Sequence, residues 1–242
     1  MKEFKKMAFI IACIINFVGC VRAGHFGEIY CQSYVYYYLH VKDFTFEYVP
    51  EQAKLRVSAV CDYNDPNTLC QHSKLAAQRE KFQQLSIKHN DTSWNQWINE
   101  LSVVERTTAT VLKHDYSSIT ITSDTDYDEL HPAGTPLDDI VGFQGYSYKP
   151  FFDSGYKWLG YYPDGNATTI EKTLNELTNE DMTALAKRAR NDSMQHPYDF
   201  AFNFLSLPTA SKVHNLKIKF TTDTGSEFVY YTTVDFGVQN EE

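Results

Sequence analysis

The feature of this chain that most constrains its fold is a strict alternation of side chains in two neighbouring segments. In residues 42–48 an aromatic ring falls on every second position, and in residues 54–61 an apolar side chain does so. A period of two with one apolar face is typical of a half-buried antiparallel strand. The break at 49–52 contains proline and polar residues, as hairpin turns often do. The sequence therefore predicts a β-hairpin here, around which the rest of the chain is organised.

The remaining segments fix the expected fold class. The same alternation recurs at 117–123, 198–205 and, as a pair of strands, within 216–236. Helical spacing of apolar residues occurs at 71–84, 93–104 and 169–190. Because strands and helices do not alternate regularly, we expect an α+β protein with a mainly antiparallel β-sheet or sandwich core and two to four helices inserted between strands.

The predicted helix at 93–104 begins at a capping box, in which Ser93 and Gln96 each bond the other's backbone amide. Trp94 and Trp97 lie on its apolar face. Large aromatic side chains dominate the burial of area in protein cores. We therefore expect both tryptophans to anchor the core rather than to form a ligand cage.

The first 23 residues have the composition of a secretory signal peptide. Three lysines precede an apolar run at 7–15, and Val21-Arg22-Ala23 places small residues where signal peptidase cleaves. The run is too short to span a bilayer, and no second apolar stretch is long enough. We expect a signal peptide at 1–23, one secreted α+β domain at 24–242, and no stable membrane span. As an alternative, the sequence ending at Cys20 loosely resembles a bacterial lipoprotein box, which would leave a lipidated Cys20 in the envelope.

The mature chain is strongly acidic. Cleavage after Ala23 removes four basic residues and one acidic residue, which changes the net charge from −9 to −12. Such a surface disfavours nucleic acid, whose phosphates require clustered Lys and Arg.

Cys31, Cys61 and Cys70 remain after cleavage, and two of them are expected to pair in an oxidising compartment. A strong turn signal at 62–67 favours Cys61–Cys70, with Cys31–Cys61 as the alternative.

Three Asn-x-Ser/Thr sequons, at Asn90, Asn166 and Asn191, predict glycosylation in a eukaryotic or viral secretory route. Each lies at a predicted boundary between elements, where a glycan could point into water.

One acidic loop is a weak candidate for a metal site. Asp124, Asp126 and Asp128 alternate, and their oxygens suit calcium. The segment fails the EF-hand pattern, because Glu129 stands where glycine is required and Thr135 where a bidentate Glu is required. The default interpretation is a solvated acidic loop, and no other cofactor is expected.

Sequence signatures of catalysis are few. The chain has no Gly-x-Ser-x-Gly elbow, no His-Glu-x-x-His helix and no phosphate-binding glycine loop. Asp223-Thr224-Gly225 matches the aspartic-protease triplet but occurs once, and we interpret it as a hairpin turn. A histidine beside Asp128 or Asp139 would make an acid–base pair.

Aromatic residues are the strongest compositional signal, since the chain has 17 Tyr and 16 Phe. They are densest at 142–162, and tyrosine favours recognition surfaces. The predicted binding face consists of Tyr146, Tyr148, Phe151, Phe152, Tyr156, Trp158, Tyr161 and Tyr162. The competing interpretation is that these rings fill the core of a sheet.

Together these features predict a secreted, glycosylated domain that binds an extracellular protein or glycan without catalysis. The alternative is a secreted hydrolase whose His/Asp acid–base pair is assembled only in the fold. An enzyme requires a pocket in which a histidine and a carboxylate meet, whereas a binding module requires an exposed aromatic patch.

Overall fold

The protein is rich in β-structure that is mostly antiparallel. The computed structural model describes residues 28–99, 108–157, 166–187 and 198–237. In these ranges two α-helices are found, α2 (Ala76–His89) and α4 (Lys149–Asp153). The strands are β1 (Glu28–Cys31), β2 (Val35–Leu39), β3 (Val41–Val49), β4 (Lys54–Cys61), β5 (Leu69–Cys70), β6 (Gln96–Asn99), β7 (Ala109–Leu112), β8 (Tyr116–Ser123), β9 (Val141–Ser147), β10 (Thr168–Thr173), β11 (Phe200–Phe204), β12 (Val213–Thr222) and β13 (Glu227–Asp235).

The predicted central hairpin is confirmed as β3 and β4. Phe44 pairs with Ala59, and Tyr48 pairs with Leu55, so the apolar positions of both strands share one face. A short 3-10 turn, η1 (Pro50–Gln52), connects the strands and is followed by Ala53 at φ 46°. The hairpin forms one edge of a five-stranded sheet of order β10-β9-β11-β4-β3.

A second, three-stranded sheet has the order β13-β12-β8. Its hairpin turns at Asp223-Thr224-Gly225, as the sequence predicts, and Gly225 adopts φ +82°, which favours glycine. The Gly225 amide donates to the Thr222 carbonyl over 3.0 Å.

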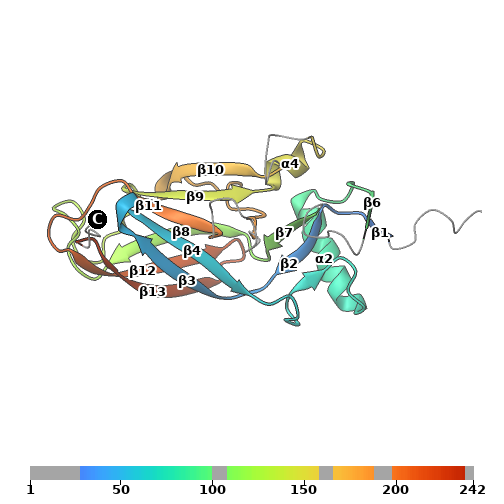
Figure 1. Cartoon of the computed structure of the whole chain (residues 1–242), viewed down its shortest axis with the longest axis horizontal. Helices are drawn as coiled ribbons and strands as arrows, with labels where there is room; N and C mark the ends of the chain where they lie inside the picture. Colours follow the sequence, from blue (N-terminus) through green and yellow to red (C-terminus); the bar gives the residue numbers. More distant parts are fainter. Residues whose placement is uncertain (1–27, 100–107, 158–165, 188–197, 238–242) are drawn as a thin grey trace, which may run out of the picture.

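One large apolar cluster draws its members from both of these sheets, which lie over one another in Figure 1. Phe44 of β3 stacks on Phe220 of β12 with ring centroids 4.9 Å apart. Phe200 of β11 meets the same Phe220 ring at 6.0 Å. The alternation of the strands thus aims their aromatic side chains into one shared interior.

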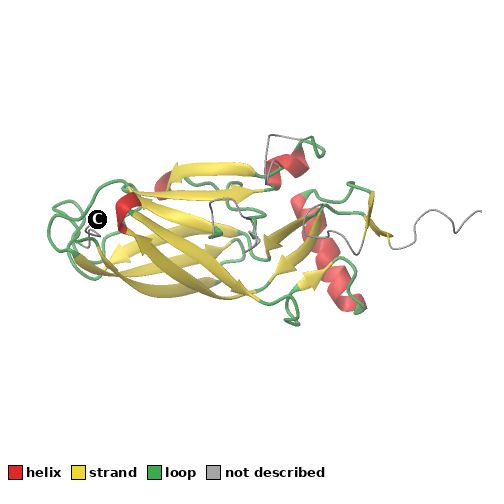
Figure 2. Ribbon diagram, viewed as in Figure 1, coloured by secondary structure: helices red, strands yellow, loops and turns green. Residues whose placement is uncertain are grey.

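A smaller group of elements lies at one end of the β-rich body (Figures 1 and 2). There β2 pairs with β7 in parallel, the one parallel pairing among the described strands, and β5 pairs with β2 on its other side. β1 and β6 form a separate two-stranded sheet. Helices α2 and α4 cover this end, and a second apolar cluster beneath them includes Tyr34, Tyr38 and Phe82.

The helices are fewer and placed differently than the spacing predicted. The helix expected at 71–84 runs from Ala76 to His89 and ends at Asn90, which caps it at φ 64°. The helix expected at 93–104 is wrong in its first half, because Gln96–Asn99 form β6; residues 100–107 lie outside the described part. The helix expected at 169–190 is also wrong: β10 occupies its start, and η2 (Leu174–Glu176) follows with a Thr173–Glu176 capping box. Pairing with a neighbouring strand overrode local helical spacing in both cases.

No helix in the described ranges combines the length and the apolar character that crossing a membrane requires.

Candidate functional site

The aromatic run at 142–162 does not form the exposed face that we predicted. Tyr148, Phe151 and Phe152 are buried, and Tyr34 contacts the Phe151 ring edge-on at 4.9 Å. Tyr146 and Tyr156 are half-buried against the same cluster. The competing interpretation, that these rings fill a core, describes the buried residues correctly, because α4 turns them towards β2. Trp158, Tyr161 and Tyr162 lie outside the described residues.

The acidic loop uses its three aspartates to hold its own backbone and that of a neighbouring strand. Asp124 accepts hydrogen bonds from the Asn215 amide and side chain, at 3.0 and 2.7 Å. Asp126 accepts from the Ala133 amide at 2.8 Å. Asp128 accepts from the Leu130 amide at 2.8 Å. The described residues include no group of three or more His, Cys, Asp or Glu side chains placed to hold a metal ion.

His131 makes both of the carboxylate contacts that the sequence suggested for a histidine. Its Nδ1 lies 2.7 Å from Asp128 Oδ1 and its Nε2 lies 3.0 Å from Asp139 Oδ1. Burial favours the neutral ring, but the two carboxylates outweigh burial and raise the pKa of His131. Both ring nitrogens are occupied and the side chain is buried, so this imidazole has no nitrogen available to a substrate.

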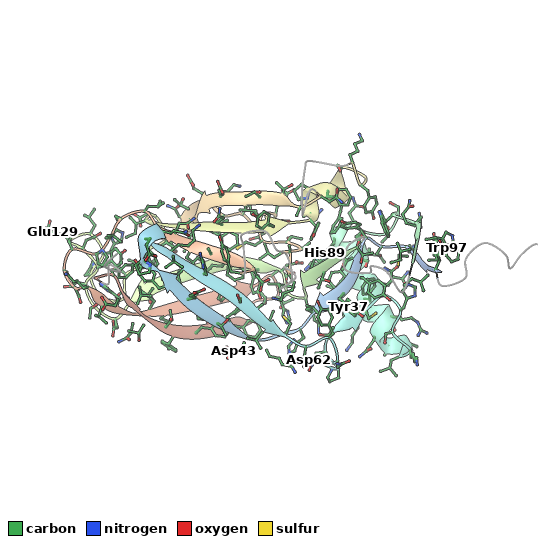
Figure 3. The ribbon with its side chains drawn as sticks, viewed as in Figure 1. Tyr37, Asp43, Asp62, His89, Trp97 and Glu129 are labelled. Atoms are coloured by element: carbon green, nitrogen blue, oxygen red, sulfur yellow. The ribbon has the colours of Figure 1, made fainter. Side chains whose placement is uncertain are left out.

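A second histidine–carboxylate pair lies deep inside the protein. His89, at the end of α2, is fully buried, and its Nε2 lies 2.9 Å from Asp115 Oδ2. Its Nδ1 lies 3.3 Å from the Tyr38 hydroxyl. Burial alone would raise the pKa of Asp115, but hydrogen bonds from His89, Lys88 and the Ala184 amide lower it to about 2. Figure 3 shows His89 within the body of the molecule.

Lys88 extends this pair towards solvent, because its ammonium group bonds both Asp115 and Asp223. It thereby connects α2, the start of β8 and the β12–β13 turn. A pocket of about 310 Å³ opens beside it, and Lys81 and Lys113 complete the charged part of its wall. The Lys113 ammonium group donates to the Asn67 carbonyl at 2.9 Å. Lys88 pairs with both aspartates at once, so these charged groups form an ion network that joins three elements.

All three described cysteines are free thiols. The Cys61–Cys70 bond expected from the turn at 62–67 is therefore not formed in this structure. Cys61 lies at the end of β4, where burial raises the pKa of its thiol to about 11. Cys70 lies in β5, opposite Tyr37 of β2. The intervening turn is present, but it connects strands of two different sheets.

The described sequons differ in accessibility. Asn90 is exposed and caps α2. Asn166 is half-buried, and its side-chain nitrogen donates to the Tyr34 hydroxyl at 3.0 Å. Its side-chain oxygen is buried without a hydrogen-bond partner. Asn191 lies outside the described residues.

An exposed aromatic pair, which we did not predict, lies at the outer end of the protein. Tyr30 of β1 and Trp97 of β6 occupy directly opposite positions in the antiparallel pair. Their ring centroids are 5.4 Å apart, and the rings are inclined at 58°. Tyr30 is 42% exposed and Trp97 is 50% exposed, so the expectation that Trp97 anchors the core is wrong. In Figure 3 Trp97 lies at the opposite end of the molecule from Glu129 and its loop.

Local contacts hold this pair in place. The Tyr30 hydroxyl donates to Asn95 Oδ1 over 2.6 Å, and Asn95 itself adopts φ 53°. The amides of Trp94 and Asn95 both donate to the Gln32 carbonyl. Trp94 is half-buried and meets Tyr34 edge-on at 5.3 Å, so of the two tryptophans it is the one that joins the core.

No alternation of apolar and polar residues at 96–99 could have revealed this pair, because Trp97 and Ile98 are adjacent. In a strand neighbouring side chains point to opposite faces, whereas helical spacing groups Trp97 and Ile98 on one face. The side chains follow the strand pattern, since Ile98 is buried and Trp97 is exposed. Comparison of the chain with protein-family models, with curated proteins and with solved structures found no match.

Proposed function

We propose that this protein is a secreted binding module without catalysis, and that the Tyr30–Trp97 pair is its contact surface for an extracellular glycan. The observation that carries the proposal is the exposure of two adjoining aromatic rings at the outer end of the molecule. Folding has buried most of the other aromatic side chains that the structure describes. Tyr63 and Tyr231 are also exposed, but in the Tyr30–Trp97 pair both adjoining rings are exposed.

The chemistry of the pair suits a sugar ring. The face of an aromatic ring carries partial negative charge, which attracts the polarised C–H groups on the apolar face of a pyranose. Sugar hydroxyls need hydrogen-bond partners at the rim of such a surface, and the exposed side chains of Asn95 and Gln96 precede Trp97 in the chain. Gln96 Nε2 donates one hydrogen to the Trp94 carbonyl at 3.3 Å and has a second hydrogen to donate. Asn95 Oδ1 accepts from Tyr30, which leaves its side-chain NH2 group to donate.

Size favours a glycan over a protein as the partner. A standard protein–protein interface buries roughly 800 Å² on each partner. Two half-exposed rings offer much less area than that, whereas one or two sugar units can cover them. A protein ligand is the alternative outcome of the experiment below.

Both histidine–carboxylate contacts support a role without catalysis. His131 and His89 have both ring nitrogens occupied, and both side chains are buried. A general base must reach a proton of the substrate through a free nitrogen. The secreted hydrolase that we weighed as the alternative lacks such a nitrogen at these two positions.

We propose that the protein is exported through its N-terminal segment. The basic start, apolar run and cleavage site within residues 1–23 support export, with Gly24 as the first residue of the product. A product that begins at a lipidated Cys20 would instead support the envelope alternative.

We also infer that the five-stranded and three-stranded sheets form the two faces of a sandwich, because one apolar cluster takes residues from both.

The test is binding of the purified chain to a panel of immobilised oligosaccharides, with Trp97→Ala and Tyr30→Ala beside the wild type. Tyr231→Ala is the matched control, since Tyr231 is 70% exposed on β13, in a different sheet. We expect at least one glycan to bind the wild type and the control equally. Trp97→Ala should weaken that binding tenfold or more, a loss of about 1.4 kcal/mol.

Two results would overturn the proposal. One is wild-type binding that Trp97→Ala and Tyr30→Ala leave unchanged, while circular dichroism shows all variants folded. The other is failure of the wild type to bind any glycan together with Trp97-dependent binding to a purified surface protein. That second result would assign the same surface to a protein ligand.

A further inference from the structure

We propose that Cys31 and Cys70 form a disulfide bond in the exported protein, and that the structure records this pair in its reduced form. Neither of the pairings considered from the sequence is this one. Cys31 and Cys70 are the farthest apart in the chain of the three cysteines that the structure describes. The fold, however, brings their segments together at the base of the β1–β6 sheet.

Contacts on both sides of the proposed bond place the two segments against each other. Cys31 forms a small buried cluster with Tyr36 and Ile98, and Cys70 packs against that cluster. Gln71, the residue after Cys70, accepts a hydrogen bond from the Gln32 amide at 2.7 Å. Its side-chain oxygen also accepts from the Ser33 amide at 3.2 Å. The backbone after one cysteine is therefore bonded to the residue after the other.

The next residue, His72, contacts the Cys31 thiol itself, with Nε2 3.6 Å from Sγ. The thiols of Cys31 and Cys70 also interact electrostatically. Burial, with a smaller contribution from the nearby Cys70, raises the pKa of Cys31 to about 12. Burial raises the pKa of Cys70 as well. Both thiols are therefore neutral near pH 7, so their oxidation requires a base to take the protons, and the His72 ring beside Cys31 can serve as one.

Cys61 has a different environment. It lies in β4 opposite Val41 and packs against the large cluster between the two main sheets. Burial raises the pKa of its thiol to about 11, Lys187 lowers it and Asp199 raises it, and neither of the other cysteines contributes. We therefore expect Cys61 to remain a thiol.

The bond forms by thiol–disulfide exchange with a small-molecule disulfide such as glutathione disulfide. The half-buried Cys70, as thiolate, attacks one glutathione sulfur, which forms a mixed disulfide and releases one glutathione thiolate. His72 takes the proton of Cys31, and the Cys31 thiolate attacks the Cys70 sulfur and releases the second glutathione. Two protein thiols are oxidised, one glutathione disulfide is reduced, and the two protons end on the glutathione thiols.

The bond would tie β1 to the body of the protein. Tyr30 immediately precedes Cys31, so the constraint would also hold one ring of the exposed aromatic pair. The disulfide does not depend on the proposed glycan binding, because peptide mapping detects it directly. Failure of either proposal is therefore distinguishable from failure of the other.

The test uses the full chain exported through an oxidising compartment, alkylated under denaturing, non-reducing conditions and digested. Trypsin is unsuitable alone, because no Lys or Arg separates Cys61 from Cys70. Cleavage before Asp62 and Asp65 separates them. We expect a peptide containing Cys31 linked to one containing Cys70, and alkylation of Cys61. The linked peptide should disappear on reduction and persist in Cys61→Ser.

The proposal is overturned if all three cysteines are alkylated, or if Cys61 is found in the linked peptide. The melting temperature, measured with and without reductant, gives a second test that needs little protein. Reduction should lower the melting temperature of the wild type, and it should leave that of the Cys31→Ser/Cys70→Ser double variant unchanged. An equal effect of reduction on both proteins would also contradict the assignment.

Discussion

His89 and Asp115 come from the end of α2 and from the residue before β8, and they meet inside the protein with Nε2 2.9 Å from Oδ2. Both side chains are buried, and Lys88 connects the pair to Asp223 in the β12–β13 turn. This network joins the helix-covered end of the protein to the three-stranded sheet.

Substitution of Asp115 should therefore destabilise the fold. Asp115→Asn removes the charge that faces His89 and Lys88, and loss of one member of a buried ion pair typically costs about 3 kcal/mol. Chemical denaturation at pH 7 measures the change. Asp43→Asn is the control, since Asp43 is exposed on β3, and we expect a change of less than about 0.5 kcal/mol there. Equal stability of the two variants would contradict the role assigned to the network.

Asp115 should also make the stability of the fold depend on pH. The pKa of Asp115 is lowered to about 2, so its contribution is complete above its unfolded pKa of 3.8 and is lost as the pH falls towards 2. At 1.36 kcal/mol per pH unit the contribution is about 2 kcal/mol. In Asp115→Asn this part of the pH dependence should be absent. The unfolding free energy of the wild type and of Asp115→Asn is measured from pH 5 down to the lowest pH at which both fold. The same pH dependence in both proteins would refute this prediction.

Phe152 tests whether the aromatic run at 142–162 is core. The side chain is 1% exposed and contacts Tyr148 and Phe151. Phe152→Ala should lower the unfolding free energy by about 3–5 kcal/mol, because it leaves a cavity. Tyr231→Ala, at an exposed position, should cost less than about 1 kcal/mol. A loss below 1 kcal/mol in Phe152→Ala would return this residue to the candidates for a surface role.

His131 and His114 should respond to pH in opposite directions. The pKa of His131 is raised, so its stabilising contribution is present below its unfolded pKa of 6.5 and is lost as the pH rises through the folded value. Burial, helped by Lys113 and His40, lowers the pKa of His114, so that residue costs stability as the pH falls below 6.5. Relative to the wild type, His131→Gln should therefore lose stability mainly at pH 6, and His114→Gln should gain it there. Denaturation at pH 6 and pH 8 measures both differences, and the same sign for both variants would contradict these assignments.

Accessibility distinguishes the two described sequons. Asn90 is exposed, and its side-chain nitrogen makes only a long surface hydrogen bond of 3.4 Å to Asp153 Oδ1. Asn166 is half-buried: its side-chain nitrogen, to which a glycan would attach, bonds the Tyr34 hydroxyl at 3.0 Å, and its side-chain oxygen is buried. A glycan at Asn166 would have to enter this half-buried site. We expect the protein secreted from a eukaryotic host to carry a glycan at Asn90 and none at Asn166. Glycopeptide mass spectrometry checks both, with Asn90→Gln as the control that loses the modification; occupied Asn166 in the folded product would contradict the prediction.

The long strands of this protein were predictable from its sequence, whereas most of its helices were not. The hairpins at β3–β4 and β12–β13 were predictable, because burying one face of a strand leaves a period-two pattern in the sequence. The helix expected at 169–190 failed because Thr168–Thr173 finds a partner in β9, and such pairing is invisible in local spacing. Trp97 was misassigned for the same reason. Its partner Tyr30 lies in β1, far away in the chain.

The sequence alone determined the apolar face of each long strand, the hairpin turn at Gly225 and the segments rich in aromatic residues. Those properties follow from the alternation of neighbouring side chains and from the backbone freedom of glycine, which are local. Only the tertiary structure decided that Phe152 is buried while Trp97 is exposed, that His89 meets Asp115, and that the Cys70 segment lies against Cys31. Each of these depends on contacts between elements remote in sequence, and the energy of such contacts arises only when the sheets pack together.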